Sequence, residues 1–278
     1  MAKMADDTDL DRTPAGAQVA SATIARLRPA SAAAVPCKIC GGPAALCGAV
    51  DFHKSCEELR GFHLPPAGVP ISYRRCANCG FLFTDAFDDW SEAQFREHIY
   101  NEGYAAVDPD YRVARPRNNA ELVSRLWGQY KEQLRLLDYG GGNGVLCAAL
   151  RSVGYPVAVS YDPFVPDFAR RPEGKYNLVT CFETFEHMPD PLAGIASIIE
   201  SVDEPGFVMF STLLQPMEFD SIGLAWWYVG PRNGHISIFS LKALKLAWQH
   251  HGYKLSSFND NIHFAYRVLP EFAQGIAR

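Results

Sequence analysis

The sequence predicts an α/β fold, a sheet with helices on both faces, preceded by a small cysteine-rich module. Apolar runs of strand length alternate with helical patterns from residue 134 onward. The first of these runs ends in an acid and a glycine-rich turn, residues 138–144. Two C-x-x-C pairs lie well ahead of that turn. The regular alternation of strand and helix indicates a mostly parallel sheet.

The composition excludes some classes of protein. Of 278 residues, 48% are hydrophobic and 21% are charged, as expected for a soluble globular chain with one large and one small domain. Apolar runs are too short to span a membrane, and the N-terminus lacks the pattern of a secretion signal. A net charge of −5 does not favour nucleic acid or an anionic membrane as a partner. We therefore expect a cytoplasmic protein with reduced cysteines.

Changes in composition divide the chain into four parts. Residues 1–35 are rich in Ala, Asp, Thr and Ser and are expected to form a disordered tail. Residues 36–84 contain both cysteine pairs. Residues 85–132 are expected to form a helical bridge or lid, and residues 133–278 the α/β domain.

The paired cysteines predict a structural zinc site. Cys37 and Cys40 form one pair, Cys76 and Cys79 the other, and glycine follows each pair. Four such thiols are a complete ligand set for zinc, and the glycines let backbone N–H groups turn toward the sulfurs. The alternative is two unrelated pairs of buried thiols, which the paired spacing disfavours. The strand expected at 81–84 would form a hairpin around the second pair, giving a small module similar to a zinc ribbon.

The bridge is expected to contain two helices. Ser91 is placed to cap a helix that ends at His98, and a second helix is expected over residues 118–130. Three tyrosines in this region are candidates for the wall of a ligand pocket: Tyr100, Tyr104 and Tyr111. The polar segment 50–58 either lines a pocket or forms a simple loop.

The glycine-rich turn predicts a site for a nucleotide-like cofactor. Glycines at 140, 142 and 144 follow Asp138 and precede a helix, in the pattern D-x-G-x-G-x-G. The dinucleotide fingerprint G-x-G-x-x-G would require a glycine at Val145, so a dinucleotide is disfavoured. The next strand, 157–162, ends in Asp162, which can accept hydrogen bonds from both ribose hydroxyls or serve as a turn residue.

The remaining elements follow in order. A short segment, 164–175, precedes the strand over 176–182, so the third strand and its helix are expected to be shortened or absent. A helix begins at Asp190-Pro191 and a strand covers 206–214. Adjacent aromatics at Trp226, Trp227 and Tyr228 form the rim of an acceptor site or a hydrophobic plug. The chain closes with a helix over 240–251 and two strands, 254–258 and 264–269, paired as an antiparallel hairpin.

Two motifs resemble those of the class I S-adenosylmethionine-dependent methyltransferases. The first is D-x-G-x-G-x-G, and the second is E-x-x-E-H at Glu183–His187, although Asn177 replaces the more usual aspartate of its strand. The resemblance covers about 117–270 and implies a Rossmann-like methyltransferase sheet. It also implies S-adenosylmethionine as the cofactor, held by Asp138, Tyr139, Gly140, Gly142, Asn143, Gly144, Asp162, Phe182 and Glu183.

The second motif supplies the candidate catalytic residues. Histidine titrates near neutrality, so His187 beside Glu186 is a candidate base for the acceptor proton. Alternatively, the two side chains only brace their loop. E-x-x-E-H with a later histidine, His235, also resembles metal-assisted O-methyltransferases. That resemblance implies a divalent ion such as Mg²⁺ held by Glu183, Glu186, His187 and His235.

The expected function is methyl transfer from S-adenosylmethionine to a small, hydroxylated or sugar-like acceptor. A cysteine-rich module ahead of such a core is also similar to that of sugar C-methyltransferases, which points to a sugar or glycan precursor. Three alternatives stay open: a metal-assisted O-methyltransferase, a zinc-ribbon RNA methyltransferase and a non-enzymatic binding module. The acidic net charge disfavours RNA. The sequence identifies neither the acceptor nor the methylated atom nor the oligomeric state.

Overall fold

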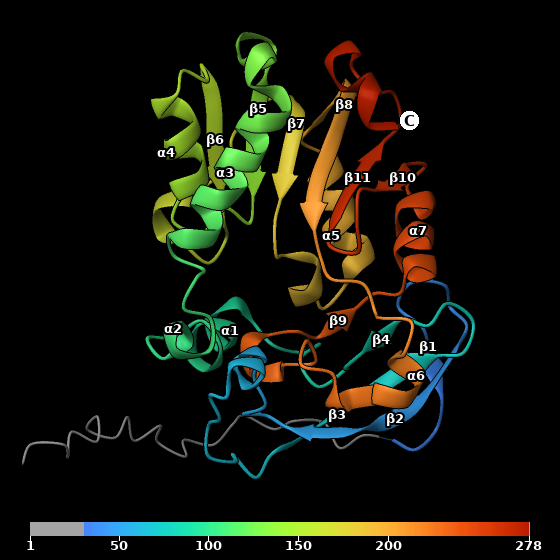
Figure 1. Ribbon diagram of the computed structural model, residues 1–278. Coiled ribbons are helices and arrows are strands. Elements are labelled where there is room, and N and C mark those ends of the chain that lie inside the picture. The colour runs from blue at the N-terminus through green and yellow to red at the C-terminus, as the bar shows by residue number, and fades with distance from the viewer. Residues whose placement is uncertain (1–30, 278) are drawn as a thin grey trace, which may run out of the picture.

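The computed structural model describes residues 31–277, which form two sheets and the helices around them (Figure 1). The first thirty residues of the predicted tail lie outside the described residues. The larger sheet lies in the upper part of Figure 1 and the smaller one below it. Among the described residues, no helix combines the length and the apolar character that crossing a bilayer requires.

The large sheet has six strands in the order β10-β11-β8-β7-β5-β6. Strands β6, β5, β7 and β8 run parallel to one another. Strand β11 is antiparallel to β8, and β10 is antiparallel to β11. Their bounds are β5 (Arg135–Tyr139), β6 (Val157–Tyr161), β7 (Tyr176–Cys181), β8 (Val202–Ser211), β10 (Lys254–Ser257) and β11 (Ile262–Tyr266). The predicted Rossmann-like sheet and its final antiparallel hairpin are therefore confirmed.

The predicted shortening after the second strand is also confirmed. From β6 the chain passes through one short turn, η3 (Pro166–Phe168), directly into β7. Within residues 31–277, no strand pairs with the outer edge of β6. Thirteen residues separate Asp162 from the start of β7 (162 to 176), which is too short for another strand and a packed helix.

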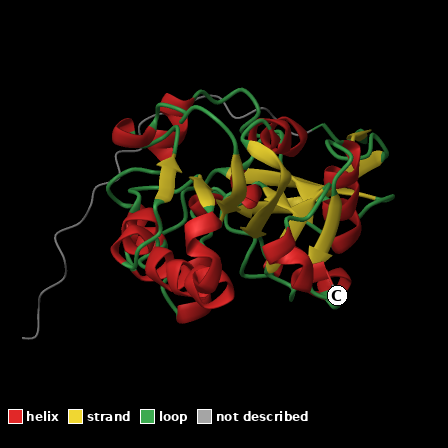
Figure 2. Ribbon diagram, turned by 90° about the horizontal axis from the view of Figure 1, so that it is seen from above, coloured by secondary structure: helices red, strands yellow, loops and turns green. Residues whose placement is uncertain are grey.

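Helices cover both faces of the large sheet, as predicted (Figure 2). On one face lie α3 (Ala114–Trp127) and α4 (Val145–Ser152), whose apolar side chains pack with Leu136 and Phe207. On the other lie α5 (Pro191–Ile199) and α7 (Leu241–His250), which pack with Phe210. Both have the predicted N-caps: Asp190 accepts from Ala193 N–H, and Ser240 accepts from Ala243 N–H.

The small sheet has the order β1-β2-β3-β4-β9 and is antiparallel throughout. Its first four strands come from the cysteine-rich module: β1 (Val35–Pro36), β2 (Pro43–Asp51), β3 (Pro70–Cys76) and β4 (Leu82–Phe83). The predicted hairpin is β3 with β4. The fifth strand, β9 (Ser237–Ile238), comes from the far end of the chain and pairs with β4. The small sheet is thus completed by the α/β domain.

Short helices connect the two sheets. The bridge contains α1 (Glu92–His98), capped by Ser91 as predicted, and α2 (Tyr104–Val107). Their aromatic side chains form a third core with residues of the small sheet, including Ile71, Tyr73 and Leu82. The remaining short elements are η1 (Cys56–Arg60), η2 (Gly128–Gln133), η4 (Phe185–His187), α6 (Phe219–Ile222), η5 (Gly223–Ala225), η6 (Pro231–Asn233) and η7 (Glu271–Ala277).

Candidate active site

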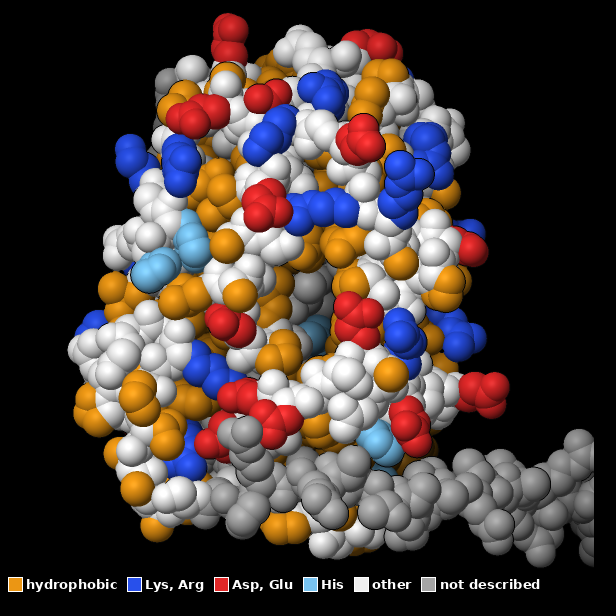
Figure 3. Space-filling model, turned by 180° about the vertical axis from the view of Figure 1, so that it is seen from behind, with side chains coloured by type: hydrophobic (Ala, Val, Ile, Leu, Met, Phe, Trp, Pro, Cys, Tyr) orange, Lys and Arg blue, Asp and Glu red, His pale blue; other side chains and the backbone are white. Residues whose placement is uncertain are grey.

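A cavity of about 160 Å³ lies where the carboxyl edge of the large sheet faces the small sheet. A hollow is visible between these two parts in the space-filling view from behind (Figure 3). The lining includes three predicted site residues, Glu183, His187 and His235. Ligands of open α/β sheets bind at this edge. The other lining residues are Cys56, Glu57, Leu59, Arg60, Val107, Asp108, Arg115, Trp227, Tyr228 and Asn233.

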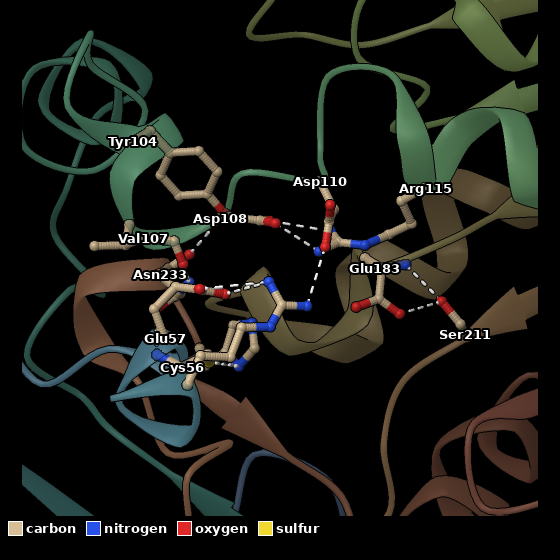
Figure 4. Close-up of polar contacts among 12 residues, drawn as sticks. Cys56, Glu57, Tyr104, Val107, Asp108, Asp110, Arg115, Glu183, Ser211 and Asn233 are labelled. Atoms are coloured by element: carbon tan, nitrogen blue, oxygen red, sulfur yellow. Dashed lines mark hydrogen bonds and ion pairs between the residues drawn. The ribbon is translucent and has the colours of Figure 1, made fainter. Parts of the chain in front are cut away.

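Glu183 follows the end of β7 and is held in a strained conformation. Its φ is 50°, and it is the one non-glycine residue of the described chain with positive φ. Ser211 clamps it, because Glu183 N–H donates to Ser211 Oγ at 2.8 Å and Ser211 Oγ donates to Glu183 Oε1 at 2.6 Å (Figure 4). Burial raises the pKa of Glu183 to about 7. Strain of this kind is found chiefly at functional sites.

Glu186, in the turn η4, is a fully buried carboxyl without a hydrogen-bond partner among the described residues. Burial raises its pKa to about 7. The hydroxyls of Tyr228 and Thr212 partly oppose that rise, although neither completes a hydrogen bond to the carboxyl. A buried unpaired carboxylate is costly, so a cation is the natural partner at this position.

The two histidines present their Nε2 atoms for other contacts. His187 Nδ1 lies 3.1 Å from Gly234 O, and His235 Nδ1 lies 2.8 Å from Tyr228 O. A carbonyl oxygen only accepts, so each Nδ1 carries the hydrogen and each Nε2 keeps a lone pair. Burial lowers the pKa of His187 to about 4 and that of His235 well below its ordinary value. Both rings are therefore neutral at pH 7.

Glu186, His187 and His235 each bring one ligand atom within 4.8 Å of the other two. His187 Nε2 lies 3.9 Å from Glu186 Oε1, and the ring centroids of His187 and His235 are 5.0 Å apart. The structure thus gathers three of the four residues of the expected divalent-ion site. Glu183 lines the cavity but is not part of that cluster.

The glycine-rich turn connects β5 to α4, as predicted. Its three alternate glycines have positive φ, and a Cβ at Gly140 or Gly144 would approach a side chain to 2.5 or 2.6 Å. Asp162 braces the turn, since its carboxylate accepts from Gly142 N–H at 2.9 Å and from Phe164 N–H at 2.8 Å. Asp162 thus acts as a turn residue, and its expected role toward the ribose hydroxyls stays a prediction.

The remaining predicted cofactor residues differ in orientation. Asp138 is buried and accepts from Thr180 Oγ1 at 2.7 Å, and burial raises its pKa to about 7. Tyr139 has its hydroxyl 2.9 Å from Ser197 Oγ on α5. Asn143 Nδ2 donates to the carbonyl of Arg112, ahead of α3, and Phe182 is buried. The Tyr139 hydroxyl therefore contacts α5.

The four cysteines converge as predicted. Cys37 and Cys79 have their sulfurs 3.6 Å apart, Cys40 and Cys76 3.5 Å apart, and all four lie within 4.8 Å of one another. Backbone N–H groups face the sulfurs, from Ile39 to Cys37 at 3.4 Å and from Cys79 to Cys76 at 3.5 Å. This donor set and its N–H contacts suit a tetrahedral zinc ion.

Several cavity residues were not singled out from the sequence. Arg115 on α3 forms a bidentate ion pair with Asp108, at 3.0 and 2.5 Å (Figure 4). Arg60 on η1 pairs with Asp110 at 3.1 Å and joins the module to the bridge. No local motif marks these residues; only the polar segment 50–58 hinted at a pocket wall, and it supplies two lining residues. Of the adjacent aromatics, Trp226 is buried as a plug and Trp227 lines the cavity.

Comparisons with known proteins identify the family of the α/β domain. A family model described as a methyltransferase domain matches residues 111–257. The ubiquinone biosynthesis O-methyltransferase of Thiobacillus denitrificans is 31% identical over 102 residues, which cover 28% of this chain and 44% of that protein. The protein of the same name from Bordetella avium is 31% identical over 116 residues, 34% of this chain and 46% of that protein. The chain thus spans less than half the length of these relatives.

A solved structure shows a weaker similarity. It is the magnesium protoporphyrin IX methyltransferase of Synechocystis with bound SAH, which is 18% identical. It covers 66% of this chain and 97% of its own, with a TM-score of 0.43.

Proposed function

The chain belongs to the methyltransferase domain family, and we propose that it transfers the methyl group of S-adenosylmethionine to a hydroxyl of a small acceptor. One observation carries the proposal: a cavity lined by Glu183, His187 and His235 lies at the sheet edge, and Thr184, the neighbour of Glu183, lies against Gly140 of the glycine-rich turn. In-line transfer requires acceptor, methyl and sulfur in one row. A cofactor on the turn and an acceptor in the cavity provide that order.

On the cofactor side, the positive-φ glycines would leave room for the cofactor. Asp162, which lies beside the turn through its bond to Gly142 N–H, would accept from the ribose hydroxyls. Asp138 is the acid nearest the start of the turn. These roles rest on the resemblance of the D-x-G-x-G-x-G motif to that of the methyltransferases, and on the position of these residues at one edge of the large sheet.

On the acceptor side, the small volume and the Trp227 and Tyr228 wall favour a small molecule. The relatives that match are named O-methyltransferases, which favours oxygen as the methylated atom. A sugar-like acceptor uses the same hydroxyl chemistry, and an acceptor panel separates it from a phenol. RNA is disfavoured by the net charge of −5.

We also propose that Glu186, His187 and His235 hold a divalent ion. The unpaired buried carboxyl and the two imidazoles with free Nε2 atoms fit such an ion. When bound, the ion would polarise the acceptor hydroxyl. Two nitrogen donors suit manganese, iron, cobalt or zinc better than magnesium. A neutral His187 with a pKa near 4 is a weak base at pH 7, so metal assistance is favoured over the free base.

The test combines calorimetry and activity. We expect S-adenosylmethionine and S-adenosylhomocysteine to bind and NAD not to bind. Tritium from labelled cofactor should enter a member of a panel of small hydroxylated acceptors that includes phenols and sugars. Tighter binding of NAD would contradict the proposal. EDTA should stop turnover and manganese should restore it. Glu186→Gln should remove manganese binding while S-adenosylhomocysteine still binds, whereas exposed Glu92→Gln should leave both unchanged. Turnover unaffected by EDTA would restore His187 as the base.

A further inference from the structure

Strand β9 lies between the cysteine module and the E-x-x-E-H turn. On one side it pairs with β4, in the register Leu82↔Ile238 and Phe83↔Ser237. On the other side, Ile236 N–H donates to Glu186 O at 2.8 Å, and Ser237 Oγ donates to Met188 O at 2.6 Å. His235 immediately precedes this stretch. A displacement of β4 therefore moves both His235 and the turn that carries Glu186.

Tyr73 is a second connection between the module and His235. It lies on β3, three residues before the zinc-site Cys76, and it is fully buried. Its hydroxyl donates to the carbonyl oxygen of His235 at 2.7 Å. The N–H of His235 donates to Gly230 O at 3.1 Å. Both backbone polar groups of His235 are therefore held, and Tyr73 holds the carbonyl.

The second cysteine pair is joined to the end of β9 and to the start of α7. Gln215 Nε2 donates to Gly80 O at 2.8 Å and to Ile238 O at 2.9 Å. Ser240 Oγ donates to the carbonyl of Cys79. The backbone around the zinc site, strand β9 and the N-terminus of α7 thus form one hydrogen-bonded unit.

The module also supplies part of the cavity wall. Four lining residues come from η1: Cys56, Glu57, Leu59 and Arg60. The backbone N–H of Cys56 donates to Asn233 Oδ1 at 2.8 Å, and Asn233 Nδ2 donates to Val107 O at 2.7 Å. The cofactor side, in contrast, is built from β5, β6 and the turn between β5 and α4. The module therefore adds to the acceptor side, beside Glu183 and His187 that follow β7, but supplies none of the candidate cofactor residues.

We propose that Tyr73 is a positioning residue through which the four-cysteine module sets the place of His235, so that the module governs acceptor binding independently of the cofactor. The proposal rests on the proposed function only in taking the cavity as the acceptor site. It follows from the hydrogen bond to the His235 carbonyl and the β4–β9 pairing.

The test uses Tyr73→Phe, which removes the hydroxyl alone. Its control is Tyr155→Phe, because the Tyr155 hydroxyl is buried without a hydrogen-bond partner in residues 31–277 and lies away from the cavity. In the full chain labelled with ¹⁵N-histidine, we expect the ring signals of His235, assigned with His235→Asn, to shift in Tyr73→Phe only. Affinity for S-adenosylhomocysteine should stay unchanged.

A second pair of variants tests the zinc side. Cys76→Ser should shift the same His235 signals, and exposed Cys47→Ser, outside the cluster, should not. With a phenol that is methylated, Tyr73→Phe should raise KM on the order of threefold to tenfold, as expected for one lost hydrogen bond. Unshifted His235 signals in Tyr73→Phe would overturn the proposal. A loss of S-adenosylhomocysteine affinity as large as the rise in KM would overturn it too. The spectra need no acceptor, so they decide this proposal even if no phenol is methylated.

Discussion

At the scale of single residues, the site combines several acids that are buried away from water. Asp138, Glu183 and Glu186 each have a pKa raised to about 7, and burial is the main cause in every case. Such groups lower the stability of the folded chain at neutral pH and are retained where function needs them. S-adenosylmethionine carries a positive sulfonium, so acids beside its site are favourable only once it binds.

Asp138 gives a pH dependence with a definite sign. Its pKa is near 7 in the folded chain and near 3.8 ordinarily, so the folded state holds the proton more tightly. The free energy of unfolding therefore falls as pH rises from about 4 to about 7. Asp138→Asn should remove this part of the fall, on the order of 2–4 kcal/mol. Urea titrations at pH 5 and pH 8 measure it, with exposed Asp167→Asn as the control. An unchanged pH slope would show that Asp138 ionises normally.

At the scale of elements, local signals predicted most of the large sheet. Asp190-Pro191 and Ser240 marked helix starts because capping is encoded within a few residues. Strand β9 carried no such signal: two residues inside a long loop become a strand only because β4 is beside them. Strand β2 was also missed, since its Ala- and Gly-containing sequence has no clear alternation.

For the candidate site too, residues in local motifs could be predicted and residues brought together by tertiary packing could not. The E-x-x-E-H motif and the glycine-rich turn are contiguous in sequence, so the residues on them could be named. Arg115 and Asp108 are seven residues apart and lie in no motif, and η1 reaches the cavity only through tertiary packing. His235 could be named from the resemblance, but its partner Tyr73 is 162 residues away in the chain.

Asp190 and Ser240 both cap a helix, but we expect different consequences when each cap is removed. Asp190→Ala removes only the cap of α5, whereas Ser240→Ala removes the cap of α7 and the bond to Cys79. Each should cost about 1 kcal/mol in unfolding free energy, with a further loss of about 1 kcal/mol for Ser240→Ala. Urea unfolding measures both. Only Ser240→Ala should also speed zinc loss to a chelator; equal rates in the two variants would contradict this.

The four-cysteine cluster predicts one zinc per chain, bound in a structural role. Four cysteine ligands leave no open position for chemistry. Elemental analysis should give about one zinc that Cys37→Ser removes and Cys47→Ser retains. A fully folded chain free of metal at this cluster would be the contrary result.

At the scale of the whole molecule, the small sheet takes its fifth strand, β9, from the second half of the chain. Hydrogen bonds also join the β9 segment to the residues that follow β7 of the large sheet. We therefore expect residues of both sheets to unfold in a single transition, with equal calorimetric and van't Hoff enthalpies. S-adenosylhomocysteine at about 100 times its dissociation constant should stabilise the whole by about 2.7 kcal/mol and move the one transition upward. A separate early transition that the ligand does not move would show two independent units.

Strand β9, which residues far from the module supply to the small sheet, also limits how the module could be exchanged among related enzymes. A chimera that joins residues 31–84 to another methyltransferase would lack the partner that β4 finds in β9, and its edge would stay open. A working graft would have to carry residues 212–240 as well, which return from β8 to the start of α7. Recombination between the module and the rest of the chain would separate η1 from His235, which line the same cavity, so a transferable unit has to include both segments.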